Sequence, residues 1–251
     1  MSYFFRHETD GFVFPKYGPT HIVLLIVAAL GAWLIWKYGE RGGRLRLILF
    51  VTLLVTQILL YGWFFTGGAL WIVAGLPLYH CRISILAMLI ALSIGKKTER
   101  SGGLSRGLAI YLGTFGAPVA LLIPIMEPFS FPHITNVSYF AGHILMIWTI
   151  VYMVKVERYP FDDRTLYQTL IAFNVMNLFI LTIDHLLDMN YAYFLFSPVL
   201  TAFFDKFPYP LYVLTAFAIY NGLIVLIHFV GKAVHAGLSA ERSKQKTARR
   251  G

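Results

Sequence analysis

The residues best suited to chemistry are the chain's single cysteine, Cys81, and its neighbours in the stretch Leu76-Pro77-Leu78-Tyr79-His80-Cys81-Arg82. A cysteine attacks as the thiolate, and a histidine within reach can take the thiol proton and later return one to a leaving group. An apolar run from Ile85 to Ile94 follows, so the cysteine stands at the head of a segment that can enter a membrane. An isolated cysteine in an apolar helix is, by itself, more often a small packing residue.

The composition excludes an ordinary soluble domain, because 58% of the 251 residues are hydrophobic and only 13% are charged. The formal charge of +9 is dispersed over short connections and the C-terminal segment, a pattern that argues against nucleic-acid binding. One cysteine excludes an internal disulfide and a cysteine-rich metal site. The spacing of Glu127 and His133 is only a weak indication of a metal site, so we expect neither a metal nor a cofactor.

Seven apolar stretches approach the roughly 20 residues that a transmembrane helix needs. We therefore predict an all-α, polytopic bundle of seven transmembrane helices over residues 20–38, 44–65, 77–95, 104–125, 137–156, 164–189 and 209–234. Residues 1–19 are expected to form an extracytoplasmic N-terminal segment, residues 20–234 the transmembrane domain, and residues 235–251 a basic, disordered cytosolic tail.

The distribution of basic residues predicts the orientation of this bundle. Most of the 21 lysines and arginines lie in the first, third and fifth connections between helices and in the C-terminal segment. Because connections rich in Lys and Arg stay in the cytosol, we predict that the N-terminus lies outside and the C-terminus in the cytosol.

The predicted topology brings ionisable residues from three helices to one level, in the outer half of the bilayer. At about 1.5 Å per residue, Cys81 lies roughly 6 Å below the outer start of its helix and His143 roughly 9 Å below that of its own. By the same measure Asp184 and His185 lie roughly 6 to 8 Å below the outer end of theirs. Ionisable residues at this depth are costly and often functional, although a lone histidine or an Asp–Arg pair is commonly structural.

Cys81 and Arg82 point about 100° apart on a helix. Arg82 is therefore better placed to bind a lipid phosphate, or to pair with Asp184, than to act on the sulfur itself.

Several short motifs resemble those of one known family in their order and spacing. They are Leu76-Pro77-Leu78 followed by Cys81 and Ile83-Ser84, Phe131-Pro132-His133, Tyr139-Phe140-Ala141-Gly142-His143, Asn190-Tyr191, and Pro208-Tyr209-Pro210-Leu211-Tyr212. Over most of its length the chain resembles the bacterial YwaF-type integral membrane proteins, which are similar to the animal transmembrane protein 164. That family has a helical-bundle fold, and its animal member is described as a phospholipid acyltransferase with an essential cysteine after the Leu-Pro-Leu motif.

The resemblance implies a multi-pass acyltransferase, or transacylase, of the bacterial plasma membrane. It would move a fatty acyl chain from a phospholipid to a lysophospholipid through a thioester on Cys81, with His143 as the base. The expected partners are these membrane lipids, without a soluble acyl donor, a cofactor or nucleic acid. The family has a polar residue two positions after the proline, and either Tyr79 or His80 could take its role. The expected substrate-binding residues are Tyr79, His80, Arg82, Asp184, His185, Asn190 and Tyr191.

Two other classes of function stay open at this point. Arg82, Asp184 and the histidines could form a polar pathway or substrate site in a transporter, although the helices are nearly all apolar on the cytosolic side of Asn221. A seven-helix binding protein without chemistry is the other alternative, and for it the replacement of Cys81 should be silent.

Overall fold

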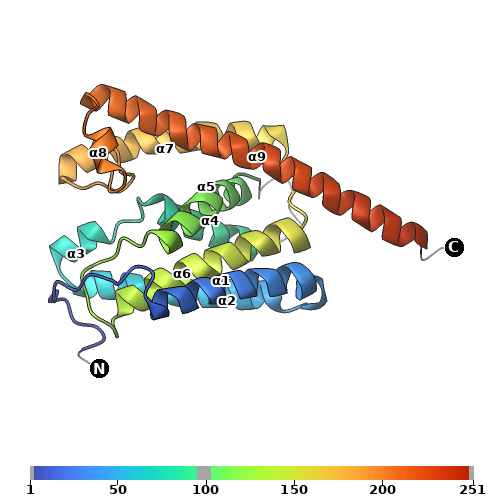
Figure 1. The fold of residues 1–251 in the computed structure, drawn as a ribbon, viewed down its shortest axis with the longest axis horizontal. Coiled ribbons are helices and arrows are strands. Elements are labelled where there is room, and N and C mark those ends of the chain that lie inside the picture. The colour runs from blue at the N-terminus through green and yellow to red at the C-terminus, as the bar shows by residue number, and fades with distance from the viewer. Residues whose placement is uncertain (1–2, 95–102, 249–251) are drawn as a thin grey trace.

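Helices make up the regular structure of residues 3–94 and 103–248, the part of the chain that the computed structural model describes (Figure 1). A 3-10 turn, η1 (Gly39–Arg41), follows the first helix, and a π-helical turn, η2 (Tyr152–Val156), extends the sixth. The α-helices are α1 (Pro19–Tyr38), α2 (Leu45–Thr66), α3 (Ala69–Ala74), α4 (His80–Ile94), α5 (Gly103–Leu122), α6 (Ile134–Val151), α7 (Asp163–Leu187), α8 (Thr201–Phe204) and α9 (Tyr209–Ala248).

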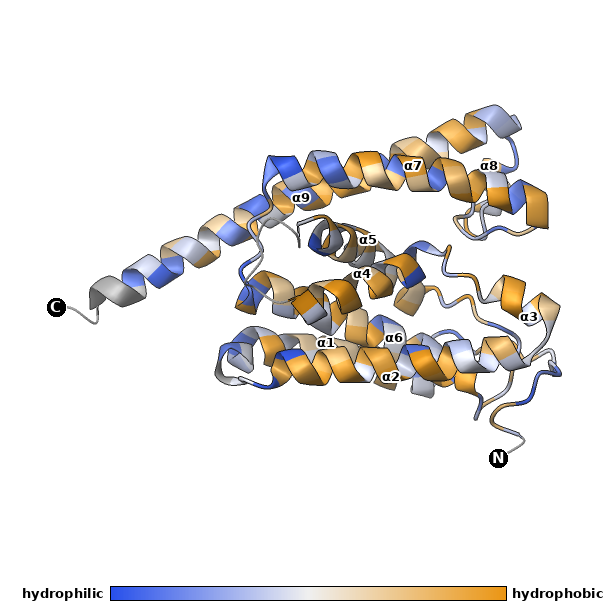
Figure 2. Ribbon diagram, turned by 180° about the vertical axis from the view of Figure 1, so that it is seen from behind, coloured by the Kyte–Doolittle hydropathy of each residue, from blue (hydrophilic) through white to orange (hydrophobic). Residues whose placement is uncertain are grey.

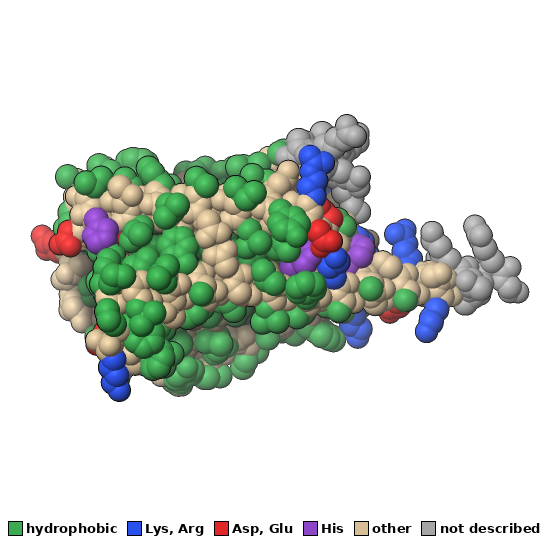
Figure 3. Space-filling model, turned by 90° about the horizontal axis from the view of Figure 1, so that it is seen from above, with side chains coloured by type: hydrophobic (Ala, Val, Ile, Leu, Met, Phe, Trp, Pro, Cys, Tyr) green, Lys and Arg blue, Asp and Glu red, His purple; other side chains and the backbone are tan. Residues whose placement is uncertain are grey.

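Six of these helices are long and apolar enough to cross a membrane: α1, α2, α5, α6 with η2, α7 and α9. Between the two ends of the molecule the visible surface carries apolar and uncharged side chains, and the charged ones gather at the ends (Figure 3). The chain is thus an all-α, multi-pass membrane protein, as its composition predicts.

The third predicted span, 77–95, differs from the prediction at its start. The described part of α4 has 15 residues and covers about 22 Å. It begins at His80 rather than at Pro77, because residues 75–79 follow an irregular path. Its expected last residue, Gly95, lies outside the described residues.

The two ends of the bundle differ in their connections. The N-terminal segment, α3 and α8 lie at one end, called here the α3/α8 end, and η1 and η2 lie at the other, the η1/η2 end (Figure 1). Two basic connections meet at the η1/η2 end, where Arg158 Nη2 donates to Glu40 Oε1 at 2.6 Å. The basic residues Lys96, Lys97 and Arg100 of a third connection lie outside the described residues.

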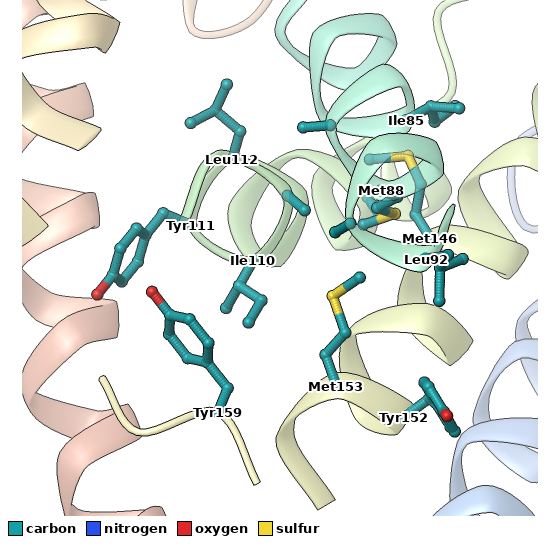
Figure 4. Close-up of a cluster of buried hydrophobic side chains, with 14 of the residues drawn as sticks. Ile85, Met88, Leu92, Ile110, Tyr111, Leu112, Met146, Tyr152, Met153 and Tyr159 are labelled. Atoms are coloured by element: carbon teal, nitrogen blue, oxygen red, sulfur yellow. The ribbon is translucent and has the colours of Figure 1, made fainter. Parts of the chain in front are cut away.

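The helices are arranged in three groups, with α4 and α5 between the pair α7 and α9 and the group of α1, α2 and α6 (Figure 1). The largest core cluster fills this middle region, with side chains such as Met88, Ile110 and Met146 (Figure 4). Helices α4 and α5 approach closely at Gly113, where an added Cβ would lie 2.8 Å from Ser84 Oγ. Small residues at such a crossing allow close packing between membrane helices.

Helix α9 is longer than predicted, and its polar C-terminal part projects from the bundle (Figure 2). The sequence predicted a helix end at 234 and a disordered tail from 235, whereas the helix continues to Ala248. Residues with high helix propensity favour this continuation. The carbonyl of Leu238 also accepts from Arg158 Nη1 at 3.0 Å, and Glu241 lies 3.8 Å from Lys155 Nζ.

The N-terminal segment is held against the loop that precedes α6. Arg6 Nη2 donates to the Asp10 carboxylate at 2.7 Å and to the Ser130 carbonyl at 2.9 Å, and the Ser130 amide donates to Asp10 at 3.0 Å. The Ile134 amide, at the start of α6, donates to the Phe4 carbonyl at 3.1 Å. Together these bonds fasten residues 4–10 to the α3/α8 end.

Acid is expected to release this segment. The Ser130 hydroxyl, and also the Arg6 guanidinium, hold the pKa of the Asp10 carboxyl well below its ordinary value. A lowered folded-state pKa adds stability above the unfolded pKa of about 4, and this stability is lost as the pH falls through the folded value. Hydrogen exchange at the Ser130 and Ile134 amides, corrected for its intrinsic pH dependence, should accelerate several-fold below pH ~4.

The variant Asp10→Asn should show the faster exchange already at neutral pH, because its amide carries no charge for Arg6. Unchanged protection of Ser130 in Asp10→Asn would show that the carboxylate does not hold the segment.

Candidate functional site

Cys81 is the second residue of α4, and its half-buried side chain packs against the main core cluster. The backbone N–H groups in the first turn of a helix have no acceptor within the helix. Because α4 begins at His80, the sulfur sits at the very start of the helix rather than about a turn inside it, as the sequence predicted.

His143 lies on α6 and is buried. Its Nδ1–H donates to the Tyr139 carbonyl at 2.7 Å, which makes Nε2 the unprotonated nitrogen of the neutral ring. Nε2 is buried and has no hydrogen-bond partner among the described residues. A neutral imidazole oriented through one nitrogen, with a free lone pair on the other, can accept a proton.

The packing of α6 against α4 sets the relative height of these two residues. An added Cβ at Gly142 would lie 3.6 Å from Ile85 Cδ1, and both helices run away from the α3/α8 end (Figure 1). Cys81 lies one helical turn before Ile85. It is therefore at the same distance from the α3/α8 end as Tyr139, and one turn closer to that end than His143. Side chains on a helix lean toward its N-terminus, so the imidazole leans toward the level of Cys81.

The structure therefore places Cys81 and His143 on neighbouring turns of two helices that pack against each other.

The Arg82 side chain bonds to two backbone carbonyls and lies beside the Glu127 carboxylate. Its Nη1 donates to the carbonyls of Ala74 at 2.7 Å and Leu76 at 3.1 Å, and its Nη2 lies 3.9 Å from Glu127 Oε1. These bonds satisfy carbonyls of the irregular chain before α4. The expected pair of Arg82 with Asp184 is wrong, because the carboxylate beside Arg82 comes from the loop between α5 and α6.

His80 and Tyr79 point to different parts of the molecule. His80 is buried, its Nε2–H donates to Asn177 Oδ1 at 2.8 Å, and its ring packs against Phe173 on α7. It ties α4 to α7 and lies away from Arg82. The Tyr79 ring instead lies 4.9 Å from the Arg82 guanidinium carbon, so Tyr79 is the one of the two beside the arginine.

Asp184, Asn190 and Tyr191 hold the loop after α7. Asp184 Oδ1 accepts from the Tyr191 amide at 2.8 Å, and Asn190 Nδ2 donates to the Phe196 carbonyl at 2.8 Å. The Tyr191 hydroxyl donates to the Val73 carbonyl at 2.5 Å, and its ring meets the edge of Tyr79 at 5.3 Å. These residues hold the loop in place, and Tyr191 packs against the ring of Tyr79.

His185 does not join the other predicted site residues. It is exposed, and its Nε2 lies 2.8 Å from the Tyr209 hydroxyl on α9. Adjacent residues on a helix point about 100° apart, so the burial of Asp184 turns His185 outward.

Two residues of the region around Cys81, Glu127 and Tyr61, were not predicted from the sequence to belong to the site. Glu127 was noted only as a weak metal ligand with His133, but it lies beside Arg82. His133 caps α6 through Thr135, and its Nε2 meets the Arg6 carbonyl at 2.9 Å. Tyr61 on α2 has a buried hydroxyl, and its ring lies next to Phe64, which contacts Arg82. A tyrosine in an apolar helix gives no signal of this kind in the sequence.

The model of a family described as the TMEM164 family matches residues 16–231, which hold the first eight helices, most of α9 and the whole region around Cys81 and His143. No curated protein matches, and no solved structure does.

Proposed function

The chain belongs to the TMEM164 family, and from this premise we propose that it is a membrane phospholipid acyltransferase. It moves a fatty acyl chain from a phospholipid to a lysophospholipid in the bacterial plasma membrane. Cys81 is the nucleophile and His143 is the base. The α3/α8 end faces the extracytoplasmic side, a proposal supported by the basic connections at the η1/η2 end.

In the first half-reaction His143 Nε2 takes the thiol proton, and the thiolate attacks the carbonyl carbon of the donor ester. The carbon–sulfur bond forms, the carbon–oxygen bond to the glycerol breaks, and the imidazolium returns its proton to the leaving alkoxide. In the second half-reaction His143 deprotonates the acceptor hydroxyl, which attacks the thioester and regenerates the thiol. Arg82 Nη2, which lies 3.9 Å from Glu127, is proposed to exchange that partner for the lipid phosphate when the donor binds.

The observation that carries the proposal is the unpartnered Nε2 of His143. Most buried polar side-chain atoms have a hydrogen-bond partner, so a buried ring nitrogen without one calls for an explanation. This ring is buried, fixed by the Tyr139 carbonyl and one turn from the level of the cysteine. That arrangement supports the proposed role of His143, which acts when the thiol comes within hydrogen-bond reach of Nε2.

Purified protein in lipid nanodiscs, given a phospholipid with a labelled acyl chain and an unlabelled lysophospholipid, tests the proposal. Mass spectrometry should detect labelled acceptor and an acyl adduct on the Cys81 peptide. Cys81→Ala should abolish both, a loss of transfer of at least about 10³-fold. Ser93→Ala is the matched control, because Ser93 lies on the same helix, is exposed and bonds only its own helix through the Ile90 carbonyl.

Well-folded wild-type protein that transfers no acyl group over a panel of headgroups would overturn the acyltransferase proposal. Flux measurements in liposomes would then address transport.

A further inference from the structure

Tyrosines from three parts of the chain lie around the first turn of α4: Tyr61 on α2, Tyr79 directly before α4, and Tyr139 on α6. The Tyr139 hydroxyl is occupied, since it donates to the Ala120 carbonyl at 2.9 Å and accepts from the Ile125 amide at 3.3 Å. The Tyr61 hydroxyl is buried and has no hydrogen-bond partner in the described part of the chain.

Tyr61 lies on α2 and faces the start of α4. Tyr61 and Phe64 are three residues apart and share one face of the helix, with ring centroids 6.4 Å apart. The Phe64 ring lies 4.8 Å from the guanidinium carbon of Arg82, the residue after Cys81. Tyr61 therefore lies on the face of α2 that meets the first turn of α4.

A buried hydroxyl without a partner is costly, and such groups in a native protein call for an explanation. The proposed chemistry supplies one, because thiolate attack on an ester places negative charge on the former carbonyl oxygen. Transferases and hydrolases of this kind stabilise that oxygen with fixed donors in a dry site.

We propose that Tyr61 is a catalytic residue whose hydroxyl donates a hydrogen bond to the oxyanion formed when Cys81 attacks an acyl ester. This inference rests on the proposed function and adds to it the third group of the site. The first-turn N–H groups of α4 have no acceptor within the helix and are the further donors of this proposal.

In this step Tyr61 donates a hydrogen bond and transfers no proton, and every bond that forms is matched by one that breaks. The sulfur–carbon bond forms as the carbonyl π pair moves to oxygen, and the Tyr61 O–H donates to that oxygen while it carries the charge. When the pair returns, the carbonyl re-forms and the ester carbon–oxygen bond breaks. The leaving alkoxide takes its proton from His143, which had received it from the thiol.

Tyr61→Phe removes the hydroxyl and keeps the ring. Acylation of Cys81 by p-nitrophenyl laurate passes through an oxyanion, whereas its alkylation by iodoacetamide is a direct displacement that does not. We expect Tyr61→Phe to slow acylation by about 10²- to 10³-fold and to leave alkylation within about twofold of wild type. Tyr220→Phe is the matched control, because the Tyr220 hydroxyl donates to the Ala192 carbonyl at 3.1 Å and takes no part in the step.

Equal effects of Tyr61→Phe on both reactions, or none on either, would overturn the oxyanion role. The first result would mean that Tyr61 acts on thiol reactivity or folding, and the second that its hydroxyl contributes nothing. The proposed function has a separate test within the same samples. Wild-type protein that is acylated by the nitrophenyl ester but not by phospholipid would refute lipid acyl transfer while supporting the role of Tyr61.

Discussion

Replacement of His143 by asparagine is expected to slow acyl transfer by about 10²- to 10⁴-fold while the protein stays folded. The asparagine amide can still donate to the Tyr139 carbonyl, as His143 Nδ1 does at 2.7 Å. It has no group that can accept and return a proton at the position of Nε2. The rate of acyl-adduct formation on Cys81 in a single turnover, followed by mass spectrometry, measures the effect directly.

His235→Asn is the matched control, because His235 lies on α9 near the η1/η2 end and far along the chain from the site. Its transfer rate should equal that of wild type. If His143→Asn formed the adduct at the wild-type rate, the base would have to be sought elsewhere.

Replacement of Glu157 by alanine is expected to lower the free energy of unfolding by about 3 to 5 kcal/mol, because it leaves a buried guanidinium without its partner. Glu157 Oε2 lies 3.4 Å from Arg106 Nε, and the two side chains are only 7% and 10% exposed. The pair joins α5 to the turn after α6. Thermal unfolding of the detergent-solubilised protein, followed by tryptophan fluorescence, measures the loss.

Two further variants identify the cause of that loss. The double variant Arg106→Met, Glu157→Met should be more stable than Glu157→Ala, because it removes both charges and refills the space. Glu40→Ala breaks an ion pair whose carboxylate is 54% exposed, and it should cost less than about 1 kcal/mol. A Glu157→Ala protein as stable as Glu40→Ala would show that the buried pair is not a strong contact.

The long helices could be predicted from the sequence because a membrane span depends on length and apolarity alone. The bounds of α1, α2, α5 and α7 agree with the prediction to within a few residues. The start of α4 could not be predicted, because a proline before an apolar run is typical of a helix start. Here Arg82 donates to the carbonyls of Ala74 and Leu76 and so stabilises a non-helical path past Pro77.

The candidate site was predicted in part. Depth along the predicted helices brought Cys81 and His143 to similar levels, and the structure places them on adjacent helices. Of the two partners expected for Arg82, Asp184 is wrong and the lipid phosphate stays a prediction. The pair with Glu127 could not be predicted, because the path of the loop that carries Glu127 follows from long-range packing. Tyr61 could not be found, since only the three-dimensional structure reveals that a neutral hydroxyl in an apolar helix is buried without a partner.

Helix α4 begins at His80, so about 4.5 Å of chain that was predicted to be helical follows an irregular path instead. One face of α4 is exposed, since Leu86 is 37% and Ile90 50% exposed. Irregular backbone at membrane depth is tolerated where it is buried in protein or lines a water-filled cavity. A lipid ester that reaches Cys81 along this exposed face would therefore meet the cysteine at a break in the helical surface of the bundle, and not within a continuous helix.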